Sequence, residues 1–119
     1  MCESARILKD DEEISVILYI DRDEIMAIGD QLSEINENAY MNGENWYALL
    51  DCYMEKYAPE LIGAFENDCE ASMYAVYCEN TEEGERNANA LLDIIISLIE
   101  DKEKLFEFVR EYGDEIEWD

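Results

Sequence analysis

The sequence predicts a single α+β domain over residues 1–119, with a small open sheet of two to four strands and about four main helices packed on it. Its 119 residues are a typical length for one domain. Hydrophobic residues make up 49% of the chain, which is enough to form a core although 34% of the residues are charged. Strand-like apolar segments alternate along the chain with longer segments in which apolar residues recur at helical spacing. An open sheet with helices on one face fits this order.

The first predicted elements are strands. Residues Ala5 to Lys9 fit a short edge strand, and the acidic run 10–13 then fits a hairpin loop. The run Ile14 to Ile20 is rich in β-branched and aromatic residues and has the length of a strand. Because it is apolar throughout, we expect it to be buried on both faces or central in the sheet.

A helix is expected over residues 22–39. Asp21 is its expected N-cap, with Glu24 in the position of a capping box. Met26 widens the apolar stripe. The stripe itself consists of Ile25, Ile28, Leu32, Ile35 and Ala39.

The clearest helical pattern follows the turn signal Asn42-Gly43, with Asn45 as the expected N-cap. Pro59 should end this helix and begin a short one over 59–66. The apolar stripe, which we expect in the core, consists of Trp46, Leu49, Leu50, Tyr53, Met54 and Tyr57.

The C-terminal half is predicted as a strand, two helices and a tail. The strand runs from Ala71 to Cys78, and Thr81 then caps a long helix. Asp101 begins another helix, which Gly113 should end in the left-handed conformation. The tail after it is either a short strand or a segment pinned by Trp118. The stripes of the two helices are Ala88, Leu91, Leu92, Ile95, Leu98 and Ile99, then Leu105, Phe106, Val109 and Tyr112. Ile94 and Ile96 make the C-terminal half of the long helix apolar nearly all round, so we expect that half to be the most buried part.

The strongest compositional signal is charge. The net charge is −24, from 32 Asp and Glu against 8 Lys and Arg. Nucleic acid and anionic membranes are therefore excluded as expected partners, since both are recognised by clustered Lys and Arg. The acidity favours a cationic partner, such as a basic protein, a polyamine or a metal ion. The alternative is that it only keeps the protein soluble.

Several chemistries lack their residues. Histidine is absent, which removes the commonest general base and any Ser-His or Cys-His dyad. The four cysteines, Cys2, Cys52, Cys69 and Cys78, have no CxxC spacing and read best as reduced thiols. The N-terminus has no apolar signal region, and no run is long enough to span a bilayer. We therefore expect a cytoplasmic protein that is not an enzyme and holds no metal or cofactor.

One helix face is a candidate binding surface. Tyr47 falls off the Trp46 stripe, beside Glu44, Asp51 and Glu55. An exposed tyrosine among carboxylates suits contact with a basic protein, because tyrosine is a favoured interface anchor. An ordinary surface tyrosine is the alternative.

Three blocks of the chain together resemble the immunity protein 51 family of bacterial polymorphic toxin systems. They are MNGENWYALLDCYMEKYAPEL, ASMYAVYCENTEE and the closing GDEIEWD. The resemblance extends from Ile14 to Asp119, and its most specific parts are NGxNW, YxEKxAPEL and GDEIEW. It implies a cytoplasmic, non-enzymatic inhibitor that binds a cognate toxin and blocks its active site. The acidity suggests that the toxin is a basic protein such as a nuclease.

Two other functions stay open at this point. An acidic inhibitor of a nucleic-acid-processing enzyme, with no toxin involved, predicts the same electrostatics with a different partner. A small enzyme or metal-binding protein would need a deep pocket lined by paired carboxylates.

Overall fold

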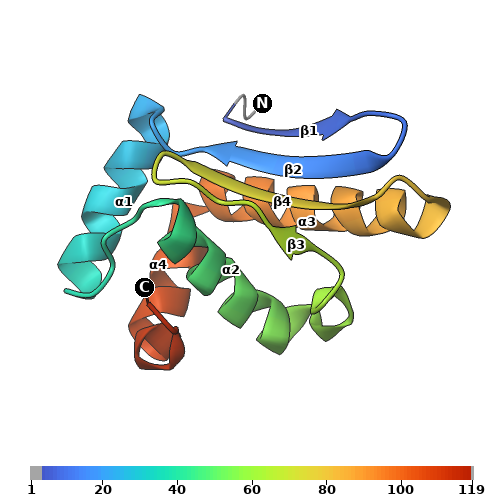
Figure 1. Cartoon of the computed structure of the whole chain (residues 1–119). Coiled ribbons are helices and arrows are strands. Elements are labelled where there is room, and N and C mark those ends of the chain that lie inside the picture. The colour runs from blue at the N-terminus through green and yellow to red at the C-terminus, as the bar shows by residue number, and fades with distance from the viewer. Residues whose placement is uncertain (1–3, 119) are drawn as a thin grey trace.

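The computed structural model describes residues 4–118, so Cys2 lies outside the described part. It confirms the α+β class, because the described chain forms a four-stranded antiparallel sheet and four α-helices (Figure 1). The elements are β1 (Ala5–Lys9), β2 (Glu13–Tyr19), α1 (Asp23–Ile35), α2 (Gly43–Tyr57), the 3-10 turn η1 (Pro59–Leu61), β3 (Glu66–Asn67), β4 (Met73–Glu79), α3 (Glu82–Glu100), α4 (Lys102–Tyr112) and the 3-10 turn η2 (Gly113–Glu115).

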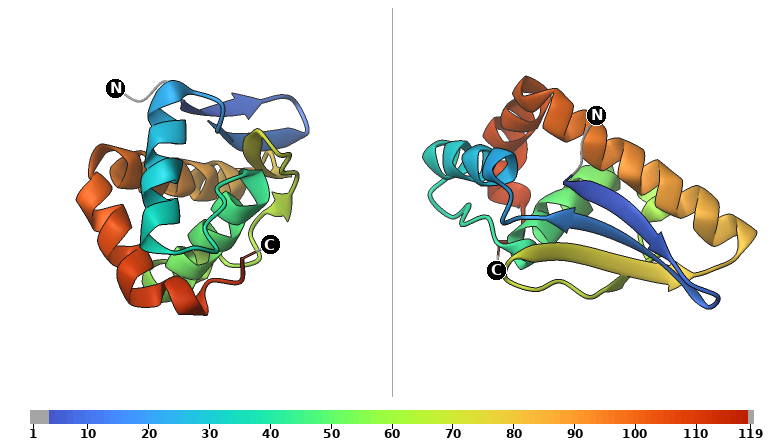
Figure 2. Two further views of the ribbon diagram at one scale, coloured as in Figure 1. Left: turned by 90° about the vertical axis from the view of Figure 1, so that its left-hand side faces the viewer. Right: turned by 90° about the horizontal axis from the view of Figure 1, so that it is seen from above.

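The sheet has the order β1-β2-β4-β3, which confirms β1 as an edge strand and β2 as a central one. Val16 of β2 lies opposite Val76 of β4, and both are buried on the face that carries the helices. Helices α2 and α3 pack on this face, and no helix of residues 4–118 covers the other (Figures 1 and 2). Alternation along the strands therefore places one set of side chains in the core and leaves the other set on the open face.

Helix α2 begins earlier than predicted. Its N-cap is Asn42, whose Oδ1 accepts a hydrogen bond from the Asn45 backbone N–H at 2.8 Å. Asn45 is instead buried, and its Nδ2 donates to the Tyr40 carbonyl at 2.6 Å. Gly43 permits this start, because a Cβ there would collide with the backbone oxygens of Glu70 and Met73. Close packing of α2 on that loop thus decides which asparagine caps the helix.

Helix α1 also differs from the prediction. Arg22, not Asp21, occupies the N-cap position, and it makes no side-chain capping bond. Glu24 accepts a hydrogen bond from Ser4 Oγ at 2.7 Å instead of closing a capping box. The helix ends at Ile35, so the buried Ala39 belongs to the loop that follows. Met26 is 53% exposed and does not widen the buried stripe.

The predicted caps of the C-terminal helices are confirmed. Thr81 Oγ1 accepts from the Gly84 N–H at 3.0 Å, and the Asp101 side chain caps α4. Gly113 has right-handed backbone angles and starts η2, and an added Cβ there would lie 2.6 Å from Asn36 Nδ2. Gly113 therefore makes no left-handed turn, and the Asn36 side chain packs closely against it.

Three further predictions are wrong in detail. Tyr57 is 59% exposed, although its ring packs 4.7 Å from that of Tyr53, centroid to centroid. The expected helix over 59–66 is only η1, because the chain then enters β3 and pairs with β4. In α3, Ile94 and Ile96 are only half-buried, so its C-terminal half is not buried all round.

Candidate partner-binding surface

The four residues proposed as a binding face lie together in one groove along α2, which we call the α2 groove. Its volume is about 320 Å³. The helical spacing of Glu44, Tyr47, Asp51 and Glu55 places them along one wall. The complete lining is Glu44, Tyr47, Ala48, Asp51, Cys52, Glu55, Asn67, Glu115, Glu117 and Trp118.

The opposite wall of the α2 groove is the C-terminal tail, which the sequence did not place there. Trp118 Nε1 donates to the Gly113 carbonyl at 3.0 Å, so the tail is pinned by Trp118 and is not a strand. Lys56 Nζ pairs with Glu115 Oε1 at 3.0 Å across 59 residues of sequence. These contacts add Glu115 and Glu117 to the groove. The GDEIEW block was the only signal for them.

Tyr47 is half-buried, whereas the sequence predicted an exposed side chain. Its ring centroid lies 6.4 Å from that of the buried Tyr74. Burial raises the pKa of the Tyr47 hydroxyl, and the neighbouring carboxylate of Asp51 raises it further. The phenol therefore remains a neutral donor at pH 7. A partly buried ring of this kind is already oriented, so that less side-chain freedom is lost on binding.

The carboxylates of the α2 groove repel one another. Burial raises the pKa of Asp51, and the charges of Glu55 and Glu117 act in the same direction. Glu44 is held in place by a hydrogen bond from Asn67 Nδ2 at 3.2 Å. Lys56 pairs with Glu115 at the edge of this groove, but its own side chain is not part of the lining. No other Lys or Arg is part of the lining either. The groove thus favours a cationic occupant.

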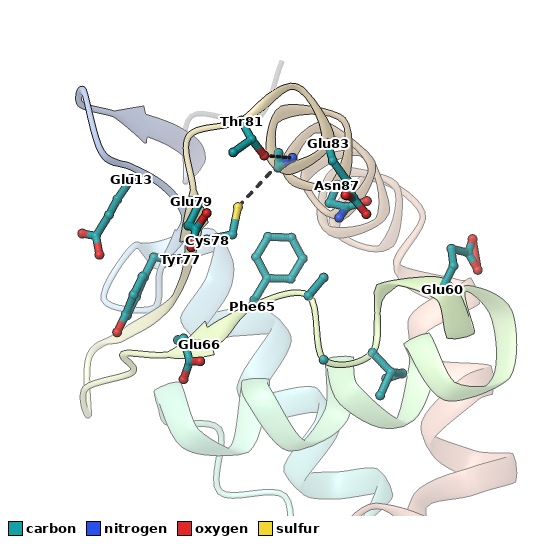
Figure 3. Close-up of a pocket in the computed structure, with 14 residues that line it drawn as sticks. Glu13, Glu60, Phe65, Glu66, Tyr77, Cys78, Glu79, Thr81, Glu83 and Asn87 are labelled. Carbon is teal, nitrogen blue, oxygen red and sulfur yellow. Dashed lines mark hydrogen bonds between the residues drawn. The ribbon is translucent and has the colours of Figure 1, made fainter.

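A second, larger groove lies on the other side of β3, and we call it the sheet-edge groove (Figure 3). Its volume is about 660 Å³. Its residues come from separate segments, so no local sequence pattern could have grouped them. They are Glu13, Glu60, Ile62, Gly63, Ala64, Phe65, Glu66, Tyr77, Cys78, Glu79, Thr81, Glu83, Gly84 and Asn87.

The three described thiols are poorly suited to nucleophilic chemistry. Burial raises the pKa of Cys52 and Cys78, and it raises that of Cys69 to about 11. Cys69 Sγ also bonds to the backbone of Ala75, at 3.3 Å from its nitrogen and 3.4 Å from its oxygen. These thiols are therefore protonated at neutral pH.

Metal ligation and membrane spanning find no structural basis in residues 4–118. No group of three acidic or cysteine side chains there is arranged to hold a metal ion. Within the same range, every helix is too short or too polar to cross a bilayer.

Comparison with known proteins identifies the family. No curated protein and no solved structure matches the chain. The family model described as immunity protein 51 matches residues 5–114, which is nearly the whole chain. The chain therefore belongs to the immunity protein 51 family, whose name implies a protein that acts against a toxin.

Proposed function

We propose that this chain is a cytoplasmic immunity protein that binds a cognate bacterial toxin and neutralises it, with the acidic α2 groove covering a basic active site. The family membership supports a toxin as the partner. The observation that carries the mode of binding is the groove itself. Five carboxylates surround Tyr47 and Trp118 there, and no Lys or Arg lines it.

Charge and shape have separate tasks in this mechanism. A net charge of −24 steers a basic toxin towards the protein and can raise association rates by about 10- to 1,000-fold at low salt. Screening limits that field to about 8 Å at physiological ionic strength. Close contacts must then supply the affinity, and Tyr47 is the proposed anchor because large, oriented aromatics dominate interface energetics.

The proposed inhibition is by occlusion and requires no catalysis by this chain. Nuclease active sites are the best match, because they bind phosphate with Lys and Arg. The groove carboxylates would contact the same cationic side chains that otherwise hold the substrate. Toxin inhibition and loss of substrate binding should therefore occur together.

The test uses the C-terminal domain of the protein encoded immediately upstream of this chain. Co-expression should rescue growth, and calorimetry should detect a complex. Tyr47→Ala and Asp51→Lys should each weaken that complex by about tenfold or more. Glu103→Lys is the matched control, because it makes the same charge change as Asp51→Lys at an exposed site outside both grooves.

Three results would contradict the proposal. The first is a failure of the unaltered chain to bind or rescue. The second is equal weakening by Glu103→Lys and Asp51→Lys, which would show that net charge and not the α2 groove matters. The third is capture of a housekeeping nuclease with no affinity for the upstream domain, which would favour an acidic regulator of a nucleic-acid enzyme.

A further inference from the structure

We propose that the sheet-edge groove is a second anchoring point for the same toxin, and that it holds an arginine side chain of that partner. This inference rests on the proposed function and deepens it. The groove is the larger of the two, at about 660 Å³ against about 320 Å³. Its lining combines five glutamates with the apolar side chains of Ile62 and Phe65, which together match a long cationic side chain better than a bare ion.

The apolar residues supply aromatic and aliphatic surface. Phe65 lies in the middle of the groove and is half-buried, whereas Tyr77 points away from it on the other side of β4 (Figure 3). Ile62 is 42% exposed at the same groove. A guanidinium group is planar, weakly hydrated and stacks on aromatic faces, and its aliphatic stem can pack on apolar surface. Arginine therefore fits this surface better than a strongly hydrated ammonium or metal ion does.

The glutamates supply negative charge that no cation in the described chain neutralises. Five of them line the groove, one each from β2, η1, β3, β4 and α3: Glu13, Glu60, Glu66, Glu79 and Glu83. The salt bridges of residues 4–118 involve none of them. All eight Lys and Arg residues lie within that range, and none lines the groove.

Two other polar side chains of the groove are already engaged in local hydrogen bonds. Thr81 Oγ1 accepts from the Gly84 N–H at 3.0 Å, and Cys78 Sγ donates to the Gly84 carbonyl at 3.6 Å. The five carboxylates are the charged acceptors of the groove. A guanidinium has five N–H donors and no acceptor, so it can contact several carboxylates of the groove at once.

The two grooves are close enough for one partner to reach both. They flank the two-residue strand β3, so that Glu66 lines one groove and its neighbour Asn67 lines the other. A small cavity of about 20 Å³ is lined by residues of both grooves, Tyr47 and Asp51 from the α2 groove and Phe65 from the sheet-edge groove. Neighbouring residues of one strand thus line both grooves, and the partner's basic surface is their proposed occupant.

The experiment compares two double charge reversals against the upstream-encoded C-terminal domain. The test variant is Glu66→Lys/Glu79→Lys. Its control is Glu100→Lys/Glu103→Lys, which changes net charge equally at exposed sites outside both grooves. At 150 mM salt we expect the test variant to raise Kd at least tenfold more than the control, mostly through faster dissociation. Circular dichroism establishes that both variants fold.

Two further arms test the occupant. Phe65→Leu keeps an apolar side chain without its aromatic face and should weaken binding severalfold while the domain stays folded. Each arginine of the partner domain is also changed to lysine in turn. One of these changes should weaken binding to the unaltered chain and have little further effect with Glu66→Lys/Glu79→Lys, because the two perturbations act on one contact.

The outcomes separate this inference from the proposed function. If the unaltered chain does not bind the upstream domain, both are overturned. If Asp51→Lys abolishes binding while Glu66→Lys/Glu79→Lys matches its control, the toxin function stands and the second anchor is overturned. If both acidic grooves matter but no partner arginine couples to the double reversal, the assignment of arginine is overturned.

Discussion

Two neighbouring residues, Trp46 and Tyr47, should respond in opposite ways to the same truncation. Trp46 is 1% exposed and belongs to the core between α2 and the sheet. Replacing a buried tryptophan by alanine lowers the free energy of unfolding by about 3–5 kcal/mol. The Trp46 Nε1 finds no hydrogen-bond partner within residues 4–118. Because burying such a donor itself costs about 1–3 kcal/mol, we expect Trp46→Ala to fall near the lower end, at about 3 kcal/mol.

That free energy converts into a measurable shift in melting temperature. Unfolding entropy is about 2.1 cal/mol/K per residue near 60 °C, which gives about 250 cal/mol/K for this chain. A loss of about 3 kcal/mol therefore lowers Tm by about 12 °C. Thermal unfolding followed by circular dichroism measures this directly. Trp46→Phe should cost less, because it keeps a ring in the core and removes the unpaired N–H.

Tyr47→Ala should instead act on binding. The ring is half-buried and contacts Tyr74, so we expect less than half the Tm loss of Trp46→Ala. The affinity for the toxin domain should fall by about tenfold or more. Tyr47→Phe serves as the control for the hydroxyl. Equal Tm losses for Trp46→Ala and Tyr47→Ala, with unchanged affinity in the latter, would refute the division between core and partner-binding face.

Four further predictions concern stability. Asn42→Ala removes the N-cap of α2 and should lower the unfolding free energy by about 1 kcal/mol in urea titrations. Gly43→Ala should destabilise the domain more than Asn42→Ala does in the same assay, because its Cβ would collide with the Glu70 and Met73 backbone oxygens. Asp51→Asn should stabilise the domain at neutral pH while weakening toxin binding. Burial, reinforced by nearby carboxylates, raises the pKa of Asp51 above 3.8, so the folded state holds this proton more tightly and stability is lost as pH rises through the raised value. The stability gained by Asp51→Asn should therefore vanish below the ordinary pKa of aspartate. Urea titrations across the acid range measure this, and an equal gain at every pH would contradict the reasoning. Raising NaCl from 10 to 100 mM should raise the Tm of the free protein and slow toxin association, since the Debye length falls from about 30 to about 10 Å; a Tm that falls with salt would contradict intramolecular repulsion.

Sequence patterns predicted the elements whose signals are local. The caps of α3 and α4 followed from Thr81 and Asp101, because each is one favourable residue directly before a clear apolar stripe. Helical periodicity also identified α2, and apolar runs of strand length identified both long strands. It could not locate the edges of a buried stripe, and so Met26 and Tyr57 were assigned to the core although both are exposed.

Features set by tertiary contacts were missed. The choice of Asn42 over Asn45 as a cap depends on packing of α2 against a loop near residue 70, which no local pattern reports. Strand β3 has two residues and exists only through its pairing with β4. Helical spacing was enough to predict the α2 wall of the α2 groove. The tail wall could not be predicted in this way, because it depends on a contact between Lys56 and Glu115, which are far apart in the sequence.

The distribution of the few cations indicates where the acidity matters. The salt bridges of the described chain lie on exposed helix and strand surfaces, where each contributes at most about 1 kcal/mol. Lys56 is the exception, since it orients the tail that forms one wall of the α2 groove. Ten carboxylates line the two grooves, five in each, and no Lys or Arg lines either. Such crowding opposes folding of the isolated chain, and a cationic partner that binds only the folded state would offset it. Solubility alone requires net charge but no particular placement. Nine of these ten carboxylates form no salt bridge within residues 4–118, and their placement beside oriented aromatic rings favours a binding role over a purely solubilising one.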